Sequence, residues 1–369
     1  MSQPPEDHMI AAHPITDRDA WNDLLRLLPG AHVLQTWEWG EFKRRTTGWT
    51  PERLAYRRGD ETLAAAQVLT RRVGPLRVMY VPRGPALDYA DRATLAAVLA
   101  HLQGLARARF AIWLKIDPEV SLATGVPGEE DDTPAPTGQA VVQTLRDLGW
   151  RQGGEVQFRN TITVDLARPA DDILMEMRQS TRRKVRTAEK KDVIIRAGTP
   201  QDIPTLYELT RLTGERDEFL TRPLDYYRAA WGSFMEAGMA HALIAEYDGQ
   251  PLAHVVLLHF SDKCWYTYGA SSNEERQRMP NYALQWQAMQ WAQAQGYRTY
   301  DFRGAPDVFD ESDRMWGVWE FKRGFGGTVQ RFIGAWDYVP YPPLYWAYER
   351  LMPRVLATLR RSSQESPGG

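Results

Sequence analysis

The feature that most constrains the fold of this chain is a segment that occurs twice, about 190 residues apart. AYRRGDETLAAAQVL begins at Ala55, and AEYDGQPLAHVVLL begins at Ala245. Both contain a strand, a turn with glycine and a second strand that opens with Leu-Ala. In both halves an aromatic strand, a helix and a further strand follow. The repeated order predicts a duplicated domain, although any two antiparallel α+β domains can share this order.

Within each half the order is helices, a hairpin, a strand, a helix and a strand. This order fits the fold of the N-acetyltransferases, so we expect an α+β chain of two tandem acetyltransferase-like (GNAT-type) domains, with mixed sheets flanked by helices. A length of 369 residues suits two domains. We place the first domain at residues 1–156 plus 328–369 and the second at residues 157–327.

Two segments have compositions that are typical of irregular structure. The first 13 residues are expected to form a disordered lead. Residues 121–138, SLATGVPGEEDDTPAPTG, are rich in Pro, Gly and acidic residues. Such clusters mark turns and loops, so we expect a mobile loop there.

Composition excludes several classes of protein. Lys and Arg number 45 against 47 Asp and Glu, which gives a net charge of −2 and argues against a wholly basic, DNA-binding protein. The one cysteine, Cys264, excludes a disulfide framework and a cysteine zinc site. No apolar run approaches the ~18 residues of a membrane span, and the N-terminus lacks the pattern of a signal peptide. We therefore expect a cytoplasmic protein without a metal site.

The segment SSNEERQRMPNYAL stands where the acetyltransferase fold usually binds the pyrophosphate of its cofactor. That binding uses a Gly-rich loop and the start of a helix. Here no Gly-x-Gly follows Arg276, and Met279 and Pro280 fill the place. Because proline has no N–H group, it cannot help to hold a phosphate. The sequence thus argues against acetyl-CoA and predicts no cofactor.

Two residues stand out as candidates for catalysis. Asp117 ends the apolar strand WLKID, and strand ends are where open sheets present reactive groups. Its alternative role is to cap the next turn. Lys322 lies in EFKRGFGG, between Phe321 and a run of glycines, where a fixed cation could stabilise an oxyanion. The alternative is a Gly-rich turn with one surface lysine.

Three further segments were assessed for a functional role. Residues 178–191 hold seven basic residues and one acidic residue, and a helix there would place Arg182, Arg183 and Arg186 in a stripe suited to an RNA backbone or simply to solvent. MYVPRGPALD is interpreted as a rigid structural turn. The segment from Leu344, LYWAYERLMPRVLATLRRSS, is expected to pack on the first domain, with contact to an anionic membrane as the alternative.

The chain resembles the Fem family (FemA, FemB and FemX type) of peptidoglycan-bridge transferases. Eight motifs in family order, from about residue 30 to 340, carry the resemblance. They are LQTWEWGEFK (Leu34–Lys43), YVPRGPALD (Tyr80–Asp88), LKIDPEV (Leu114–Val120), STRRKVRTAEK (Ser180–Lys190), RPLDYY (Arg222–Tyr227), WYTYGAS (Trp265–Ser271), YDFRG (Tyr300–Gly304) and WEFKRGFGG (Trp319–Gly327).

The resemblance implies a reaction. Fem enzymes move an aminoacyl group from a charged tRNA to the side-chain amine of the third residue of the peptidoglycan stem peptide, and they use no acetyl-CoA. The implied partners are aminoacyl-tRNA as co-substrate and a UDP-linked or lipid-linked muropeptide, which would place the protein in the cytoplasm or at the inner face of the plasma membrane. Some members carry a long helical arm; the lack of sustained heptads between Arg178 and Trp231 predicts a chain without this coiled-coil arm.

The resemblance also implies roles for individual residues. Lys43 and Arg222 match positions that hold the phosphates of the precursor. Tyr226 and Tyr268 match tyrosines that contact the precursor, and Trp39, in the same motif as Lys43, is assigned to the same surface.

At the reacting end, Asp117 matches a carboxylate near the acceptor, and Phe321 with Lys322 matches a pair at the reacting end of the aminoacyl-tRNA. Arg182, Arg183 and Arg186 are the candidates for tRNA binding. Two other functions stay open: a CoA-dependent N-acyltransferase of another amine, and a non-catalytic protein that binds tRNA or cell-wall precursors.

Overall fold

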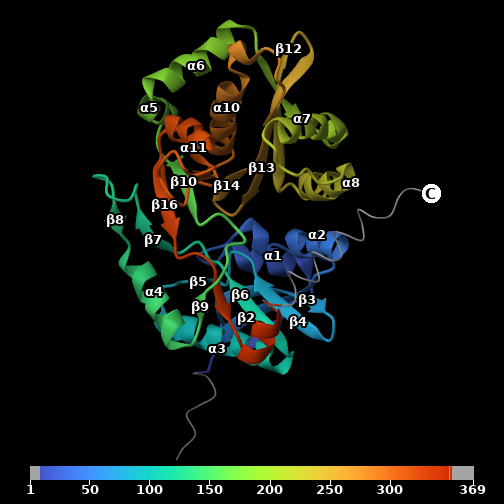
Figure 1. Ribbon diagram of the computed structural model, residues 1–369, viewed down its shortest axis with the longest axis vertical. Helices are drawn as coiled ribbons and strands as arrows, with labels where there is room; N and C mark the ends of the chain where they lie inside the picture. The colour runs from blue at the N-terminus through green and yellow to red at the C-terminus, as the bar shows by residue number, and fades with distance from the viewer. Residues whose placement is uncertain (1–8, 349, 351–369) are drawn as a thin grey trace, which may run out of the picture.

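The computed structural model describes residues 9–348 and 350, and two mixed sheets organise these residues (Figure 1). The first sheet has the order β1-β2-β3-β4-β6-β17-β9, with β5 paired to β3. Its strands are β1 (Ala11–Pro14), β2 (Thr50–Arg58), β3 (Glu61–Val73), β4 (Leu76–Val81), β5 (Ala86–Leu87), β6 (Ala111–Ile116), β9 (Arg151–Gln152) and β17 (Trp336–Tyr338).

The second sheet has the order β11-β12-β13-β14-β15-β10-β16-β7-β8. Its strands are β7 (Ser121–Thr124), β8 (Thr133–Pro134), β10 (Asn160–Asp165), β11 (Ile194–Gly198), β12 (Ala240–Tyr247), β13 (Gln250–Phe260), β14 (Lys263–Ser271), β15 (Thr299–Asp301) and β16 (Thr328–Phe332).

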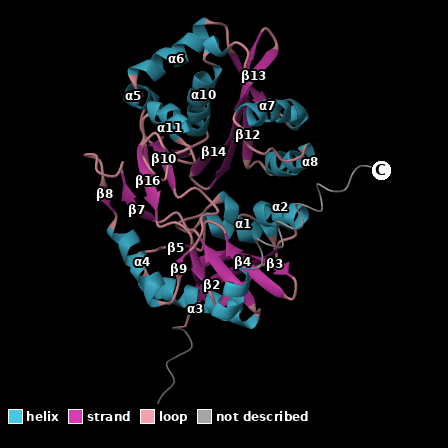
Figure 2. Cartoon of the chain, in the orientation of Figure 1, coloured by secondary structure: helices cyan, strands magenta, loops and turns pink. Residues whose placement is uncertain are grey.

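Helices surround both sheets (Figure 2). They are α1 (Arg18–Arg26), α2 (Trp37–Thr47), α3 (Arg92–Ala108), α4 (Pro136–Asp147), α5 (Ala170–Glu176), α6 (Gln179–Lys190), α7 (Ile203–Arg216), α8 (Leu224–Tyr227), α9 (Ser233–Glu236), α10 (Pro280–Ala294) and α11 (Trp316–Lys322).

The two sheets repeat one topology. In each, four antiparallel strands (β1 to β4, and β11 to β14) are followed by a strand that pairs in parallel with the fourth. The parallel pairs are β4 with β6 and β14 with β15, and α3 and α10 make the two crossovers. A parallel pair needs such a crossover because a short turn cannot return the chain to the same end of the sheet. The predicted duplication and the predicted fold class are both confirmed.

The chain passes between the two sheets more than once. β16 pairs with β10 and β7 in the second sheet, whereas β17, only a few residues later, pairs with β6 in the first. Residues 328–332 therefore belong to the second sheet, although the expected first domain resumes at residue 328. The domain bounds given above stay a prediction.

The expectation of a mobile loop at residues 121–138 is wrong at both of its ends. β7 pairs with β16, β8 pairs with β7, and α4 begins at Pro136. Within the turn, the carboxylate of Asp131 accepts a hydrogen bond from the N–H of Val126, and that of Asp132 accepts one from Gly128. The acidic and glycine residues thus build an ordered turn at the edge of the sheet.

The expected disordered lead is also wrong for its last residues. Ala11, Ala12 and His13 form part of β1, which pairs with β2, and the segment before residue 9 lies outside the described residues. Strand pairing with β2 satisfies backbone groups that a polar, proline-containing sequence would otherwise leave to water.

Three buried clusters form the core, and the third joins the two halves. One cluster lies against the first sheet and a second against the second sheet. In the third, Trp21 and Phe42 from the first half pack with Trp231, Phe234 and Trp265 from the second. Burial of such large aromatic surfaces strongly favours a fixed contact between the halves.

Between Arg178 and Trp231 the longest helix that the structure describes is α7, with 14 residues. No helix among residues 9–348 and 350 has the length and apolar character needed to cross a membrane. Of the C-terminal segment from Leu344, most lies outside the described residues. Just before it, the hydroxyl of Tyr341 donates to the carbonyl of Arg107 at the end of α3.

Candidate active site

Lys43 and Arg222, which the resemblance assigned to phosphate binding, lie close together although they come from different halves. Lys43 is on α2, and Arg222 lies two residues before the start of α8. Burial, and then the charge of Arg222, lower the pKa of Lys43 to about 8. In the part of the chain that the structure describes, neither side chain forms an ion pair with a carboxylate. Two neighbouring cations without a counter-charge form a site that favours an anion.

Aromatic side chains surround this cation pair. The Nζ of Lys43 lies 4.6 Å from the ring centroid of Trp39, and the guanidinium of Arg222 lies 5.8 Å from that of Tyr226. The ring centroids of Tyr226 and Phe42 lie 5.3 Å apart, so the aromatic side chains from the two halves are in contact. The indole Nε1 of Trp39 is buried and has no hydrogen-bond partner among the described residues. It is therefore a buried donor that a ligand could satisfy only after a small local rearrangement.

Tyr268, on β14, connects the cation pair to the junction of the two sheets. Burial raises its pKa, the hydroxyl of Tyr226 adds to that effect, and the charge of Arg303 opposes it. Arg303 follows β15, and its Nη2 donates to Oε1 of Gln157 at 2.8 Å. The structure thus places Lys43, Arg222, Tyr226, Tyr268 and Arg303 in one continuous group. Arg303 lies in the motif YDFRG, but no local feature of the sequence marks it as a site residue.

Asp117 lies at the end of β6 and is only 1% exposed. The hydroxyl of Tyr80 donates to its Oδ2 at 2.6 Å, and the backbone N–H of Arg83 donates to its Oδ1 at 2.7 Å. Burial raises the pKa of Asp117 to about 6, against the lowering effects of Arg83 and Tyr80. Both carboxylate oxygens are occupied, by partners on β4 and in the turn at Arg83 and not in the turn that follows Asp117.

The turn that carries Arg83 supplies more than rigidity. Its backbone has a φ of 51°, the left-handed region that non-glycine residues rarely adopt. The guanidinium donates to the carbonyl oxygens of Asp117, at 3.2 Å, and of Phe158, at 2.7 Å. Arg83 therefore fixes the segment around Phe158 over the end of β6.

A buried ion network joins the two halves behind this turn. Oε2 of Glu119 lies 2.6 Å from Nζ of Lys263, which lies 2.8 Å from Oδ2 of Asp301. Oε1 of Glu119 lies 3.3 Å from Nε2 of His32 and 3.7 Å from Nε of Arg83. Burial acts to raise the pKa of Glu119, but Lys263, His32 and Arg83 together hold it well below its usual range. None of these ionic contacts was predicted from the sequence.

Lys322, at the end of α11, points into the same junction. Its Nζ donates to the carbonyl oxygens of Arg303 and, at 2.8 Å, of Gly304. Burial lowers the pKa of Lys322 to about 7, with Asp301 acting in the opposite direction. Lys322 is thus a buried cation whose hydrogen bonds go to carbonyl groups.

Asp117 and Lys322 belong to one connected group, with arginine side chains between them. Arg83 bonds to Asp117 and to the carbonyl of Phe158, and Phe158 lies against Gly304. Gly304 in turn accepts from Lys322. Residues of both halves thus connect the two catalytic candidates.

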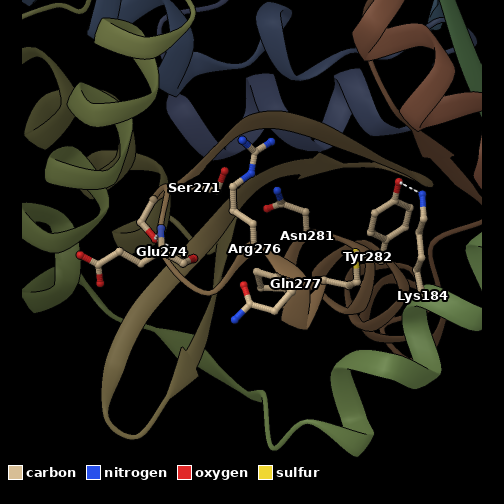
Figure 3. A pocket seen from close by; sticks show the side chains of 10 residues that line it. Lys184, Ser271, Glu274, Arg276, Gln277, Asn281 and Tyr282 are labelled. Atoms are coloured by element: carbon tan, nitrogen blue, oxygen red, sulfur yellow. Dashed lines mark hydrogen bonds between the residues drawn. The ribbon is translucent and has the colours of Figure 1, made fainter.

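A cavity of about 410 Å³ opens at the start of α10 (Figure 3). Its polar lining includes Lys184 of α6, Arg276 and Tyr282, and the Nζ of Lys184 donates to the hydroxyl of Tyr282 at 2.9 Å. The first residue of α10 is Pro280. The ring of Phe321 lies 5.1 Å from that of Tyr282. Phe321 therefore packs against one residue of the cavity lining.

The basic helix α6 is observed, and its three candidate arginines differ in their contacts. With Lys190 they line a groove of about 660 Å³. Nη1 of Arg182 donates to the carbonyl of Met175 at 2.8 Å, so part of its capacity holds the end of α5. Arg183 and Arg186 are exposed. These two offer their charge to solvent or to an anionic partner.

The fold defines a class before any relative is considered: two acyltransferase-like sheets in tandem, with their shared junction lined by charged side chains. A tandem GNAT protein from the clavulanic acid biosynthesis pathway has the same fold, with a TM-score of 0.53 and 13% identity over 90% of this chain and 99% of that one. The crystal structure of FemX is more similar, with a TM-score of 0.82 and 26% identity over 92% of this chain and all of that one.

A FemAB family model matches residues 27–248 and 235–352, so the chain belongs to the FemAB family. It is similar to the lipid II:glycine glycyltransferase of Staphylococcus aureus (strain USA300), with 28% identity over 403 aligned positions that cover 89% of this chain and 92% of that one. The predicted family is confirmed. The chain is a Fem-type transferase of peptidoglycan synthesis.

Proposed function

We propose that this protein transfers an aminoacyl group from a charged tRNA to the side-chain amine of the third stem-peptide residue of a peptidoglycan precursor. The observation that carries the proposal is the pair of Lys43 and Arg222, two adjacent cations that the fold brings together without a carboxylate partner. A diphosphate supplies the missing negative charge. Arg offers it a planar fork and Lys a point charge.

The rest of the precursor would extend from the cation pair towards the junction. The free Nε1 of Trp39 and the hydroxyl of Tyr226 can donate to the phosphates or the sugar. Tyr268 and Arg303 then lead the stem peptide to Asp117. One relative is named for action on lipid II, which supports a lipid-linked form of the precursor here.

The donor would reach the junction from the other side. The cavity at the start of α10 is lined by Arg276 and Lys184, whose charges suit the anionic acceptor end of a tRNA. Arg183 and Arg186 lie on the exposed face of α6, the helix that carries Lys184, where they can meet the phosphate backbone. In this arrangement Phe321, which packs on Tyr282 of the cavity lining, and Lys322 would lie near the reacting end of the donor.

The chemistry needs no covalent intermediate because the aminoacyl ester is already activated. The acceptor amine attacks the ester carbonyl in its neutral form; a C–N bond forms, the C–O bond to the tRNA breaks, and the proton that the amine loses passes to the leaving oxygen of the tRNA. We assign to Asp117, whose pKa of about 6 leaves it ionised at neutral pH, the orientation of the amine and the acceptance of its proton. We assign to Lys322 the stabilisation of the oxyanion.

Both groups must exchange partners for this reaction. Lys322 would give up one of its two carbonyl acceptors to the oxyanion. Asp117 would give up the hydrogen bond from Tyr80 to the incoming amine, directly or through water. The segment that carries Gln157 and Phe158 covers both positions, so its displacement is part of the proposed reaction.

One incubation tests the proposal. Purified protein is mixed with total charged tRNA and a muropeptide precursor, and the precursor is analysed by mass. The expected result is a mass increment of one amino acid that requires charged tRNA and that is lost on mild deacylation of the tRNA. An acetyl increment with acetyl-CoA would instead support the CoA-dependent alternative, and binding without any increment would support the non-catalytic one.

A further inference from the structure

The turn between α7 and α8 exposes two large apolar side chains. Leu220 is 99% exposed and Phe219 is 46% exposed. The turn is nevertheless well anchored: the N–H of Phe219 donates to the carbonyl of Gly214 at 3.0 Å, and Thr221 lies close against Gly214. The backbone is therefore held in a way that keeps these apolar groups in water. Such exposure is unfavourable unless another apolar phase covers it.

This turn also leads directly to the cation pair. Arg222 follows Leu220 by two residues, and it lies beside Lys43 of α2. In Figure 1, α8 and α2 lie one above the other along the same side of the molecule. The apolar tip, formed by Phe219 and Leu220, and the cation pair that would hold a diphosphate thus lie along one edge of the molecule. A lipid diphosphate has a matching arrangement, because its hydrocarbon chain lies immediately beside its phosphates.

The charges around the tip also suit a bilayer surface. The acidic residues on either side, Asp217 and Asp225, form ion pairs with Arg216 and Arg228, at 2.8 and 2.9 Å. Glu218 is the remaining acid of the turn. On α2, Arg45 is exposed and adds a positive charge. Most of the local negative charge is compensated, whereas Lys43, Arg45 and Arg222 retain their attraction for anionic head groups.

We propose that Phe219 and Leu220 insert into the bilayer that carries a lipid-linked precursor, so that Arg222 and Lys43 meet the diphosphate at the level of the head groups. Apolar side chains of interfacial segments enter a membrane by about 5–10 Å, which brings the residues beside them to that level. The inference rests on the proposed function, and it selects the lipid-linked over the nucleotide-linked acceptor.

Vesicle sedimentation tests this inference. The full-length protein is mixed with phosphatidylcholine vesicles that contain phosphatidylglycerol, with or without undecaprenyl diphosphate. The test protein carries Phe219→Gln and Leu220→Gln, and Leu27→Gln is the matched control because Leu27 is 85% exposed elsewhere on the surface. We expect the double variant to partition at least about tenfold less than the wild type. The Leu27 variant should differ from it by less than about twofold.

Two results would overturn the inference: a wild-type protein that does not sediment with either kind of vesicle, or a double variant that sediments as well as the wild type. The single variant Leu220→Gln guards against misfolding, because a side chain that is 99% exposed contributes nothing to the core. It should lose a measurable part of the vesicle binding while its melting temperature stays unchanged.

A soluble assay separates this failure from failure of the proposed function. With a water-soluble, nucleotide-linked precursor and charged tRNA, the double variant should transfer at the wild-type rate. Normal transfer together with unchanged vesicle binding by the double variant would contradict the proposed membrane insertion and support the proposed function. If no protein transfers an aminoacyl group but only the double variant loses vesicle binding, the proposed membrane insertion would be supported and the proposed function contradicted.

Discussion

Two groups of charged side chains lie near the junction of the sheets, and they are built in opposite ways. In the ion network, Lys263 lies between Glu119 and Asp301, so buried positive and negative charges alternate. At the other group, Lys43 lies beside Arg222 and no acid balances them in the described chain. Compensated charge holds the halves together, whereas uncompensated charge marks the place where a ligand completes the site.

Lys322 shares one property with each of these two groups. It is as buried as the network, yet its hydrogen bonds go to the carbonyl groups of Arg303 and Gly304. Burial lowers the pKa of Lys322 to about 7, so its amine loses its proton readily at neutral pH. A cation in this condition gains most from an oxyanion that forms beside it.

The largest effect is expected where a compensated charge is removed. In Glu119→Gln, Lys263 and Arg83 lose a common partner in a buried site. Breaking a buried pair costs about 3–5 kcal/mol, so the free energy of unfolding should fall by that amount. Denaturant unfolding measures it, with Glu208→Gln as control, because Glu208 pairs with Arg211 at the surface. A loss no larger than that of the control would show that the network does not stabilise the junction.

The next effect concerns Lys322. Removal of one electrostatic donor to an oxyanion lowers turnover by about 10²–10³, and we expect this loss for Lys322→Ala. Single-turnover transfer from charged tRNA measures it, and a melting curve of the same variant separates lost catalysis from lost folding. Turnover within about threefold of the wild type would exclude Lys322 from the mechanism.

The pH dependence gives a smaller and more specific effect. The neutral fraction of an acceptor amine with a pKa near ~10.4 rises about tenfold per pH unit at neutral pH. Because Lys322 has a lowered pKa of about 7, its charge is present below pH 7 and lost above it, which cancels that rise. The wild-type rate should therefore level off above pH 7, and the rate of Lys322→Arg should continue to rise, since a guanidinium stays protonated. The same break in both pH profiles would contradict this assignment.

The smallest effect is expected at the exposed face of α6. Arg183→Ala and Arg186→Ala remove charges that point to solvent. If each meets one phosphate, the slope of log affinity for tRNA against log salt should decrease by about 1 per residue. Filter binding at several salt concentrations measures the slope. An unchanged slope would favour the alternative in which this helix face is simply solvated.

The sequence predicts the fold well because the information is local and repeated. The hairpin that turns at Gly59 and the one that turns at Gly249 have their own strand and turn signals, and the same elements follow each. Such patterns define elements and their order, and the order then limits the topology. The cation pair was found only through the resemblance, because nothing local connects Lys43 with Arg222.

The ion network could not be found in the same way. Glu119 and Lys263 lie 144 residues apart, and they meet only because the two halves dock. Neither has a neighbour in sequence that marks it as buried. Asp117 shows a related limit: its position at a strand end was predicted, but the two bonds that occupy its carboxylate depend on the turn at Arg83. The prediction of a mobile loop at residues 121–138 was wrong because sheet pairing with β16 overrides a composition that is typical of loops.

A binding cycle tests most directly whether Lys43 and Arg222 hold a diphosphate. The wild type and the double variant Lys43→Ala, Arg222→Ala are each titrated with the precursor and with the same muropeptide lacking the diphosphate, and Arg228→Ala serves as control. Hydrogen bonds to charged groups contribute about 1.5–3 kcal/mol each, so loss of the diphosphate should weaken wild-type binding by at least about 10². In the double variant it should change binding by less than about threefold. Equal losses in both proteins would show that the diphosphate is bound elsewhere.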